Sequence, residues 1–337
     1  MIKPAVIVIG TSAGGIEALQ KFARGLPGDF PVPIFVVMHV SPEGSVLPEI
    51  LTRAGALPAH HPKDGEKIEA GRIYVAPPDF HMTVHDHRVR VIRGPRENRH
   101  RPAIDPLFKS AAAAYGRGAV GVVLTGLLDD GTAGLKAIKR HGGTAIVQDP
   151  KDALYTGMPL SAIERVAIDY VVPLADLPAL LNRLAHEGAD QISLLKDRED
   201  TMETTEFAEF DISTIRKEPD GMPAGLSCPD CHGTLWENKE DNLITFRCRT
   251  GHSYTPAHLV AGQAESSEIS LWETLRGIEE QAALFRHLAE GARERKLSER
   301  SVAHFLESAE EKDKAASVIR DMLLNNKKFL EDERQTG

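Results

Sequence analysis

The stretch Ile9-Gly10-Thr11-Ser12-Ala13-Gly14-Gly15-Ile16 decides the fold of the N-terminal half of the chain. The apolar run before it, residues 5–9, predicts a buried parallel strand, and residues 16–23 carry apolar side chains at helical spacing. A serine in such a strand-to-helix turn lies beside the unpaired N–H groups of the helix N-terminus, which can stabilise an oxyanion or bind a phosphate. Ser12 is therefore a candidate nucleophile; a phosphate- or nucleotide-binding turn and a plain tight turn are the alternatives.

The composition excludes several classes of protein. The 337 residues predict two or three domains, and the hydrophobic content of 42% supports a real core. A net charge of −9 argues against nucleic-acid binding and against an anionic membrane surface. No apolar run reaches the roughly 20 residues that a membrane span needs, and the first expected strand leaves no room for a signal peptide. We expect a cytoplasmic protein with no nucleic-acid partner and no membrane insertion.

Short apolar runs alternate with helical patterns over residues 1–185. The expected strands lie at residues 5–9, 34–38, 73–76, 89–92, 120–124, 144–147 and 170–172, and the expected helices at 19–23, 106–115, 134–141 and 159–163. This alternation predicts an α/β fold with a doubly wound, mainly parallel sheet that helices cover on both faces. The runs at 73–76 and 89–92 are close enough in sequence to suggest a local hairpin.

The rest of the chain divides into three segments. Residues 186–226 are rich in acidic and poor in large apolar side chains, which predicts an acidic linker. Residues 227–256 hold all three cysteines of the chain and predict a small zinc-ribbon-like module. Residues 257–330 carry apolar side chains at spacings of three and four, which predicts two amphipathic helices, folded either as an antiparallel hairpin or as a dimerising coiled coil.

A serine nucleophile needs a neighbouring base and a third group that orients this base. His39 directly follows the expected strand 34–38, and both Asp129 and Asp130 follow the expected strand 120–124. The carboxyl ends of parallel strands meet at one edge of an α/β sheet, so these side chains can come together. On spacing alone, both aspartates remain candidates.

Five motifs occur in an order that is typical of one family. They are Ile9-Gly10-Thr11-Ser12-Ala13-Gly14-Gly15, Met38-His39-Val40-Ser41-Pro42, Asn98-Arg99-His100-Arg101-Pro102, Leu124-Thr125-Gly126-Leu127-Leu128-Asp129-Asp130-Gly131 and Gly157-Met158-Pro159. Over residues 5–180 the chain resembles the catalytic domain of chemotaxis protein-glutamate methylesterases of the CheB type.

The resemblance implies roles for individual residues. Ser12 corresponds to the nucleophile and His39 to the base, and the aspartate directly before glycine, Asp130, corresponds to the orienting group. Asp129 would then be a solvated neighbour. Asn98, Arg99 and Arg101 belong to a polar cluster that either holds the acidic surface of a substrate helix or forms a solvated loop.

The resemblance also implies the reaction. The family hydrolyses glutamate γ-methyl esters on the helices of chemoreceptors and deamidates certain glutamines, without a catalytic cofactor. The oxyanion would lie against N–H groups near Ala13 and after the turn at residues 125–127. The expected partner is a methylated chemoreceptor or a similar receptor helix bundle, with a methyltransferase or a separate receiver protein as further candidates.

Two departures from the family pattern affect regulation and specificity. The familiar chemotaxis enzyme carries a phospho-receiver domain ahead of the catalytic domain, whereas the catalytic strand here begins at residue 5. Leu127 stands where methionine is common and Leu128 where a small residue is common, so the rim of the site is expected to differ.

The cysteine module carries a second, independent signal. Cys228 and Cys231 form a C-x2-C knuckle, and Cys248 and His252 form a C-x3-H pair, so the four residues predict a closed, structural Cys3His zinc site. His232 could replace His252, with poorer geometry because it directly follows Cys231. So short a module needs bound metal to fold. Because the acidic linker separates it from the expected triad, the module is expected to act apart from catalysis.

Two functions of other classes compete with the esterase. A non-catalytic signalling adaptor could use the same domain and tail to bind partners. A nucleotide-binding α/β protein is disfavoured because Ser12 stands where the G-x-G-x-x-G fingerprint needs its second glycine.

Overall fold

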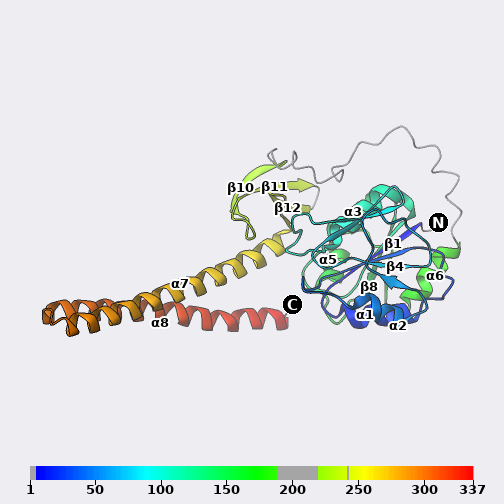
Figure 1. Cartoon of the computed structure of the whole chain (residues 1–337). Helices are drawn as coiled ribbons and strands as arrows, with labels where there is room; N and C mark the ends of the chain where they lie inside the picture. The colour runs from blue at the N-terminus through cyan, green and yellow to red at the C-terminus, as the bar shows by residue number, and fades with distance from the viewer. Residues whose placement is uncertain (1–4, 188–218, 241–242, 337) are drawn as a thin grey trace. The chain divides into compact units, whose positions relative to one another are not determined.

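The computed structural model describes residues 5–187, 219–240 and 243–336, and of residues 325–336 the backbone only (Figure 1). The chain forms two compact units, one up to Leu259 and one from Val260. Most of the expected acidic linker lies outside the described residues. Within them, helix α6 (Leu177–Glu187) and strand β10 (Met222–Ser227) occupy its two ends.

A seven-stranded sheet forms the centre of the first unit, in the order β3-β4-β2-β1-β7-β8-β9, and every neighbouring pair is parallel. The strands are β1 (Val6–Thr11), β2 (Ile34–Met38), β3 (Ala59–His60), β4 (Ile73–Val75), β7 (Ala119–Val123), β8 (Thr144–Gln148) and β9 (Tyr170–Val172). The predicted doubly wound parallel sheet is thus confirmed. Three elements of this unit, strand β3, helix α2 (Leu47–Ala54) and helix α6, were not predicted.

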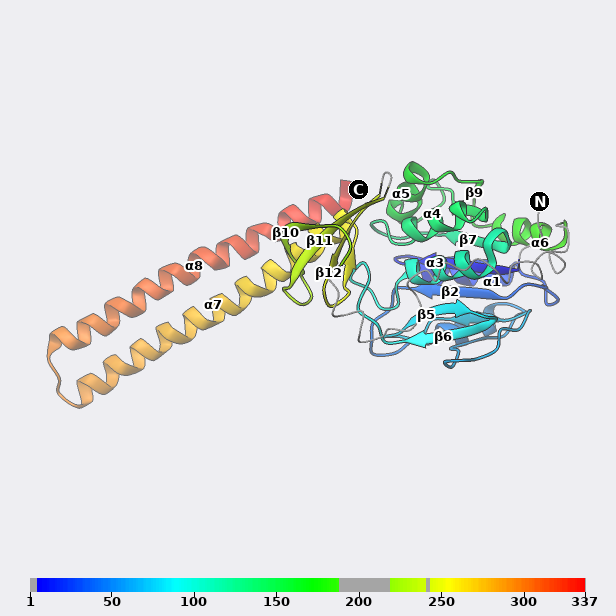
Figure 2. The same ribbon diagram turned by 90° about the horizontal axis from the view of Figure 1, so that it is seen from above.

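Helices cover both faces of this sheet because its central strands are apolar on both sides (Figure 2). Ile7 and Ile9 of β1 face the core formed with α1 (Gly15–Arg24), α2 and α6. Val6 and Val8 face the opposite core, which contains α3 (Ile104–Tyr115), α4 (Thr132–Arg140) and α5 (Gly157–Arg165). Burying a side chain such as Phe108, which is fully covered, stabilises the fold by about 2–3 kcal/mol.

The expected hairpin between residues 73–76 and 89–92 is wrong. Strand β4 belongs to the main sheet, and β6 (Arg88–Ile92) pairs instead with β5 (His81–His85) in a separate two-stranded sheet. The segment His-Met-Thr-Val-His, residues 81–85, was not predicted as a strand. In the fold His81 is buried, and both of its ring nitrogens have partners. Nε2 donates to the carbonyl of Pro95 at 2.8 Å, and Nδ1 accepts from the N–H of Ala103.

The cysteine module is a four-stranded antiparallel sheet and lies within the first unit. Its strands are β10, β11 (Thr234–Glu240), β12 (Leu243–Cys248) and β13 (Ser253–Tyr254). Its small core contains Leu235, Phe246 and Tyr254 beside the cysteines.

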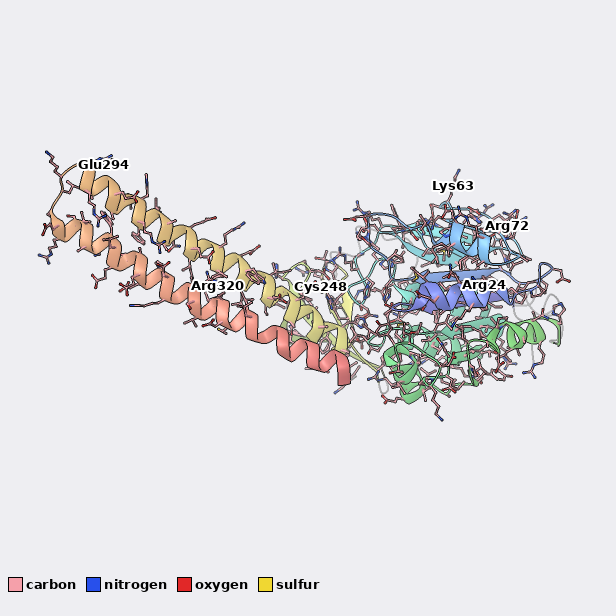
Figure 3. All side chains as sticks on the ribbon, turned by 90° about the horizontal axis from the view of Figure 1, so that it is seen from below. Arg24, Lys63, Arg72, Cys248, Glu294 and Arg320 are labelled. Carbon is pink, nitrogen blue, oxygen red and sulfur yellow. The ribbon has the colours of Figure 1, made fainter. Side chains whose placement is uncertain are left out.

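Two long helices form the second unit. Helix α7 (Pro256–Glu294) begins at the end of the first unit, and α8 (Glu299–Thr336) returns beside it as an antiparallel hairpin (Figure 3, where Glu294 marks the end of α7). Leu275 of α7 packs with Ala316 and Leu323 of α8, and Arg320 pairs with Glu279. The predicted helical hairpin is confirmed. None of the helices among the described residues is long and apolar enough to cross a membrane.

Candidate active site

Three strands bring the expected triad residues to one edge of the sheet. Strand β1 lies between β2 and β7, and from it the chain builds outward in both directions. Ser12 directly follows β1, His39 directly follows β2, and Asp130 lies in the loop after β7. This is the topological switch point, where open α/β sheets place their binding sites.

The three side chains form one hydrogen-bonded chain. Nδ1 of His39 lies 3.1 Å from Oγ of Ser12, and Nε2 of His39 lies 2.7 Å from Oδ2 of Asp130. Because the aspartate is an acceptor, the ring carries its proton on Nε2 and offers the Nδ1 lone pair to the hydroxyl. The ring therefore uses its nitrogens in the opposite sense to the chymotrypsin template. The geometry suits general-base activation of Ser12.

The carboxylate of Asp130 is buried at the N-terminus of helix α3. Oδ2 accepts from the N–H of Ile104 at 2.8 Å, and Oδ1 accepts from Nδ2 of Asn98 at 2.9 Å. Burial alone would raise the pKa of Asp130, but the hydrogen bond and charge of His39, together with the Ile104 N–H, hold it well below its usual range. The unpaired N–H groups and the dipole of a helix N-terminus stabilise anions in general. These partners thus favour the charged form of Asp130.

Asp105 and Asp130 cap each other's helices. Asp105, in the first turn of α3, accepts from the N–H groups of Gly131 at 3.1 Å and Gly134 at 2.7 Å, at the start of α4. Burial, and then the nearby charge of Asp130, raise the pKa of Asp105 to about 7. Gly131 has φ 93, a left-handed conformation that favours glycine and begins α4 directly after Asp130. The loop is therefore held from both helices.

Asp129 is not the solvated neighbour that the sequence predicted. Its side chain is buried, and its Oδ1 accepts from Oγ1 of Thr255 at 2.7 Å and from Nδ1 of His258 at 2.8 Å. Oδ2 lies 3.6 Å from a guanidinium nitrogen of Arg165. Partners that the sequence places far from residue 129 thus keep its carboxylate out of water.

In the polar cluster at residues 98–101, Asn98 is buried and the other three residues are half-buried. Asn98 is buried, with φ 51, and its amide contacts the carboxylates of Asp130 and Asp105. Arg101 is held by Asp79 and donates to the carbonyl of Gly94. A role of Asn98, Arg99 and Arg101 in substrate binding stays a prediction; the side chain of Asn98 lies beneath the site, against the triad.

The ring of His100 stacks on the ring of His39, with centroids 3.6 Å apart and planes 8° from parallel. Burial, and then the neighbouring His39, lower the pKa of His100 to about 3. His100 is therefore neutral near pH 7 and places an uncharged face against His39. The sequence offered the motif but no reason to separate this histidine from a solvated loop.

The pKa of His100 predicts how stability varies with pH. A histidine whose folded-state pKa is below its unfolded value stabilises the fold fully above about pH 6.5, and this contribution is lost as the pH falls toward 3. His100→Phe is expected to keep the ring packing. Because phenylalanine cannot be protonated, the free energy of unfolding should fall less steeply as the pH decreases through this window, by up to about 1.4 kcal/mol per pH unit. Denaturant unfolding between pH 4 and 7 measures the difference from the parent. The exposed His287→Phe serves as control, and equal slopes for parent and His100→Phe would contradict the assignment.

The rim around Ser12 is apolar. Gly126 lies so close to Ser12 that a Cβ on it would be 3.0 Å from the serine Cβ and 2.1 Å from Sδ of Met158. Next to it, Leu127 and Leu128 are exposed at 47% and 37%, as is Leu154 at 70%. Within the turn at residues 125–127, the N–H of Gly126 donates to the carbonyl of Tyr155 at 3.1 Å. The expected oxyanion donors, near Ala13 and after this turn, stay a prediction.

The four residues predicted as metal ligands come together in the cysteine module. The ligand atoms of Cys228, Cys231, Cys248 and His252 all lie within 4.8 Å of one another. The Sγ atoms of Cys231 and Cys248 are 3.6 Å apart, and Nδ1 of His252 is 3.5 Å from Sγ of Cys248. Neighbouring ligands of a tetrahedral zinc ion are separated by about 3.5–3.8 Å, so this donor set fits that ion. His252, and not His232, joins the cluster.

The fold and the site together define a class: a doubly wound α/β domain with a serine–histidine–aspartate chain at its switch point. The family model for the CheB methylesterase matches residues 7–181, and the chain belongs to this family, whose members are ester hydrolases. The match ends before the cysteine module begins.

Comparison with individual proteins agrees with this assignment. A relative from Leptospira interrogans is 40% identical over 188 residues, which are 55% of this chain and 97% of that protein. Protein-glutamate methylesterase/protein-glutamine glutaminase 2 of Anaeromyxobacter dehalogenans is 39% identical over 53% of this chain and 53% of that protein, so the match spans about half of each. The crystal structure of the Thermotoga maritima CheB methylesterase catalytic domain aligns over its whole length and 54% of this chain, with a TM-score of 0.52 and 35% identity.

Proposed function

We propose that the protein is a serine hydrolase that removes methyl esters from glutamyl side chains of a chemoreceptor-type helix bundle, with glutamine deamidation as a second activity. The observation that carries the proposal is the unbroken chain from Ser12 through His39 to the buried, charged Asp130. The names of the relatives support the substrate class. A receptor helix bundle is the partner that this chemistry implies.

The mechanism follows from the positions of the side chains. Nδ1 of His39 takes the proton of Ser12 while Oγ attacks the ester carbonyl, and Asp130 stabilises the imidazolium that results. We expect N–H groups near Ala13 and after the turn at residues 125–127 to stabilise the oxyanion. Methanol leaves with the proton from His39, and a water molecule activated by the same ring then releases the glutamate. No step needs a cofactor.

Methanol release separates this function from the signalling adaptor. The purified chain is incubated with a receptor cytoplasmic fragment that carries glutamyl methyl esters, and methanol is measured over time; an unmethylated fragment is the control. Turnover of many esters per protein molecule is expected. Stoichiometric binding without methanol would favour the adaptor instead. Ammonia release from a glutamine-bearing fragment tests deamidation in the same assay.

We also propose that the Cys3His cluster holds one structural zinc ion per chain. All four ligands come from the protein, so the site has no open position for a substrate. Metal analysis of the full chain is expected to give about one zinc per molecule, and Cys248→Ser to lower this to a small fraction and to melt the module. Ser227→Ala, beside the first ligand, is the matched control. Full zinc content in Cys248→Ser would contradict the ligand assignment.

A further inference from the structure

The segment that follows the metal-ligand cluster reaches the catalytic loop. We call residues 253–258 the strap. It begins directly after the candidate ligand His252, includes strand β13 and ends in the first turn of α7. The carbonyl of His252 accepts from the N–H of Cys248 at 3.0 Å, so the cysteine module holds the start of the strap.

The strap hydrogen-bonds both the backbone and the side chain of Asn98. The N–H of Asn98 donates to the carbonyl of Ser253 at 2.8 Å, and its Oδ1 accepts from the N–H of Thr255 at 3.1 Å. The other end of the same amide, Nδ2, donates to Asp130. Because its backbone N–H and its amide oxygen are both hydrogen-bonded, the side chain of Asn98 is held in one orientation. In this orientation Nδ2 points at the carboxylate of Asp130, which in turn orients His39.

The strap also holds the residue next to Asp130. Thr255 and His258, both almost fully buried, each donate to Oδ1 of Asp129. Asp129 precedes Asp130 by one residue, so anchoring the first carboxylate restricts the backbone that carries the second. Without the strap, a buried carboxylate would lose two of its partners, and the loop would have to move to restore them.

We propose that Thr255 and His258 are positioning residues for the reaction, and that the strap makes the cysteine module part of the catalytic apparatus. This inference rests on the proposed function, in that it takes Ser12, His39 and Asp130 to be the reacting groups. It reverses the expectation from sequence that the module acts apart from catalysis. The hydrogen bonds through Asn98 and Asp129 connect the two.

The test uses the reaction of the full chain with a fluorophosphonate, which labels an activated serine whatever the natural ester is. The dependence of the labelling rate on probe concentration separates the maximal rate from probe binding, and peptide mapping identifies the labelled serine. Thr255→Val removes the hydroxyl and keeps the shape, whereas Thr255→Ser keeps the hydroxyl. Thr274→Val makes the same change at an exposed threonine whose hydroxyl donates to the carbonyl of Ser270 in its own helix.

Thr255→Val is expected to lower the maximal rate about tenfold with unchanged probe binding, because a loosened catalytic group loses its alignment. Thr255→Ser and Thr274→Val should stay within about twofold of the parent. Parental labelling of folded Thr255→Val would overturn the proposal, as would equal losses in the valine and serine variants. If Thr255→Val does not fold, His258→Leu against His258→Asn, which keeps a donor near Nδ1, gives the same comparison. A parent that is not labelled at Ser12 would overturn the proposed nucleophile itself.

Discussion

Ser12→Ala is expected to reduce methanol release by about 10⁴- to 10⁶-fold while leaving the fold intact. In the proposed mechanism the Ser12 hydroxyl forms the covalent intermediate, and it lies 3.1 Å from Nδ1 of His39, which takes its proton. In serine hydrolases the triad acts as one unit, so removing its nucleophile costs nearly as much as removing all three members. The assay is methanol release at saturating methylated receptor fragment. Thermal unfolding shows whether the variant is folded.

The control for this prediction is Ser267→Ala, which removes the hydroxyl of an exposed serine in α7 that bonds its own helix. It should hydrolyse the ester at the parental rate. A folded Ser12→Ala protein that also hydrolyses at this rate would mean that Ser12 is not the nucleophile.

The sheet and two members of the triad could be predicted from sequence because they depend on local patterns. Parallel strands buried on both faces are continuous apolar runs, and such runs end at Thr11 and Met38. Ser12 and His39 directly follow them, so their side chains had to lie at the carboxyl edge of the sheet. No side-chain contact was needed for this inference.

The surroundings of the site could not be predicted in this way because they depend on distant pairs. The partners of Asp129 are 126 and 129 residues away, in segments that the composition separates from the domain. The reciprocal capping of Asp105 and Asp130 likewise needs the packing of α3 against α4. A lone aspartate beside glycine is usually exposed, and only the fold supplies the donors that make its burial tolerable.

The first long helix continues through a glycine. Gly291 lies within α7, which ends at Glu294. A glycine in a helix costs about 1 kcal/mol relative to alanine, which a helix packed against a partner can bear. The side chains of Ala289, Ala292 and Val302 supply that packing.

Asp130→Asn is expected to lower kcat for ester hydrolysis by about 10³- to 10⁴-fold, because an amide cannot reproduce what the carboxylate does for His39. If the asparagine oxygen accepts from the Ile104 N–H, its NH2 group meets Asn98; if it is turned round, the NH2 group faces Nε2 and favours the tautomer that carries the proton on Nδ1. In that tautomer the ring cannot take the proton of Ser12.

The matched control is Asp129→Asn, at the adjacent residue. Its carboxylate contacts the strap and not His39, so the loss should be about tenfold, through positioning alone. Both variants are assayed at saturating methylated receptor fragment, with denaturant unfolding to confirm that the Asp130 variant keeps its helix packing. Equal losses at the two positions, or a larger loss at Asp129, would mean that His39 is oriented by a different carboxylate than the one 2.7 Å from its Nε2.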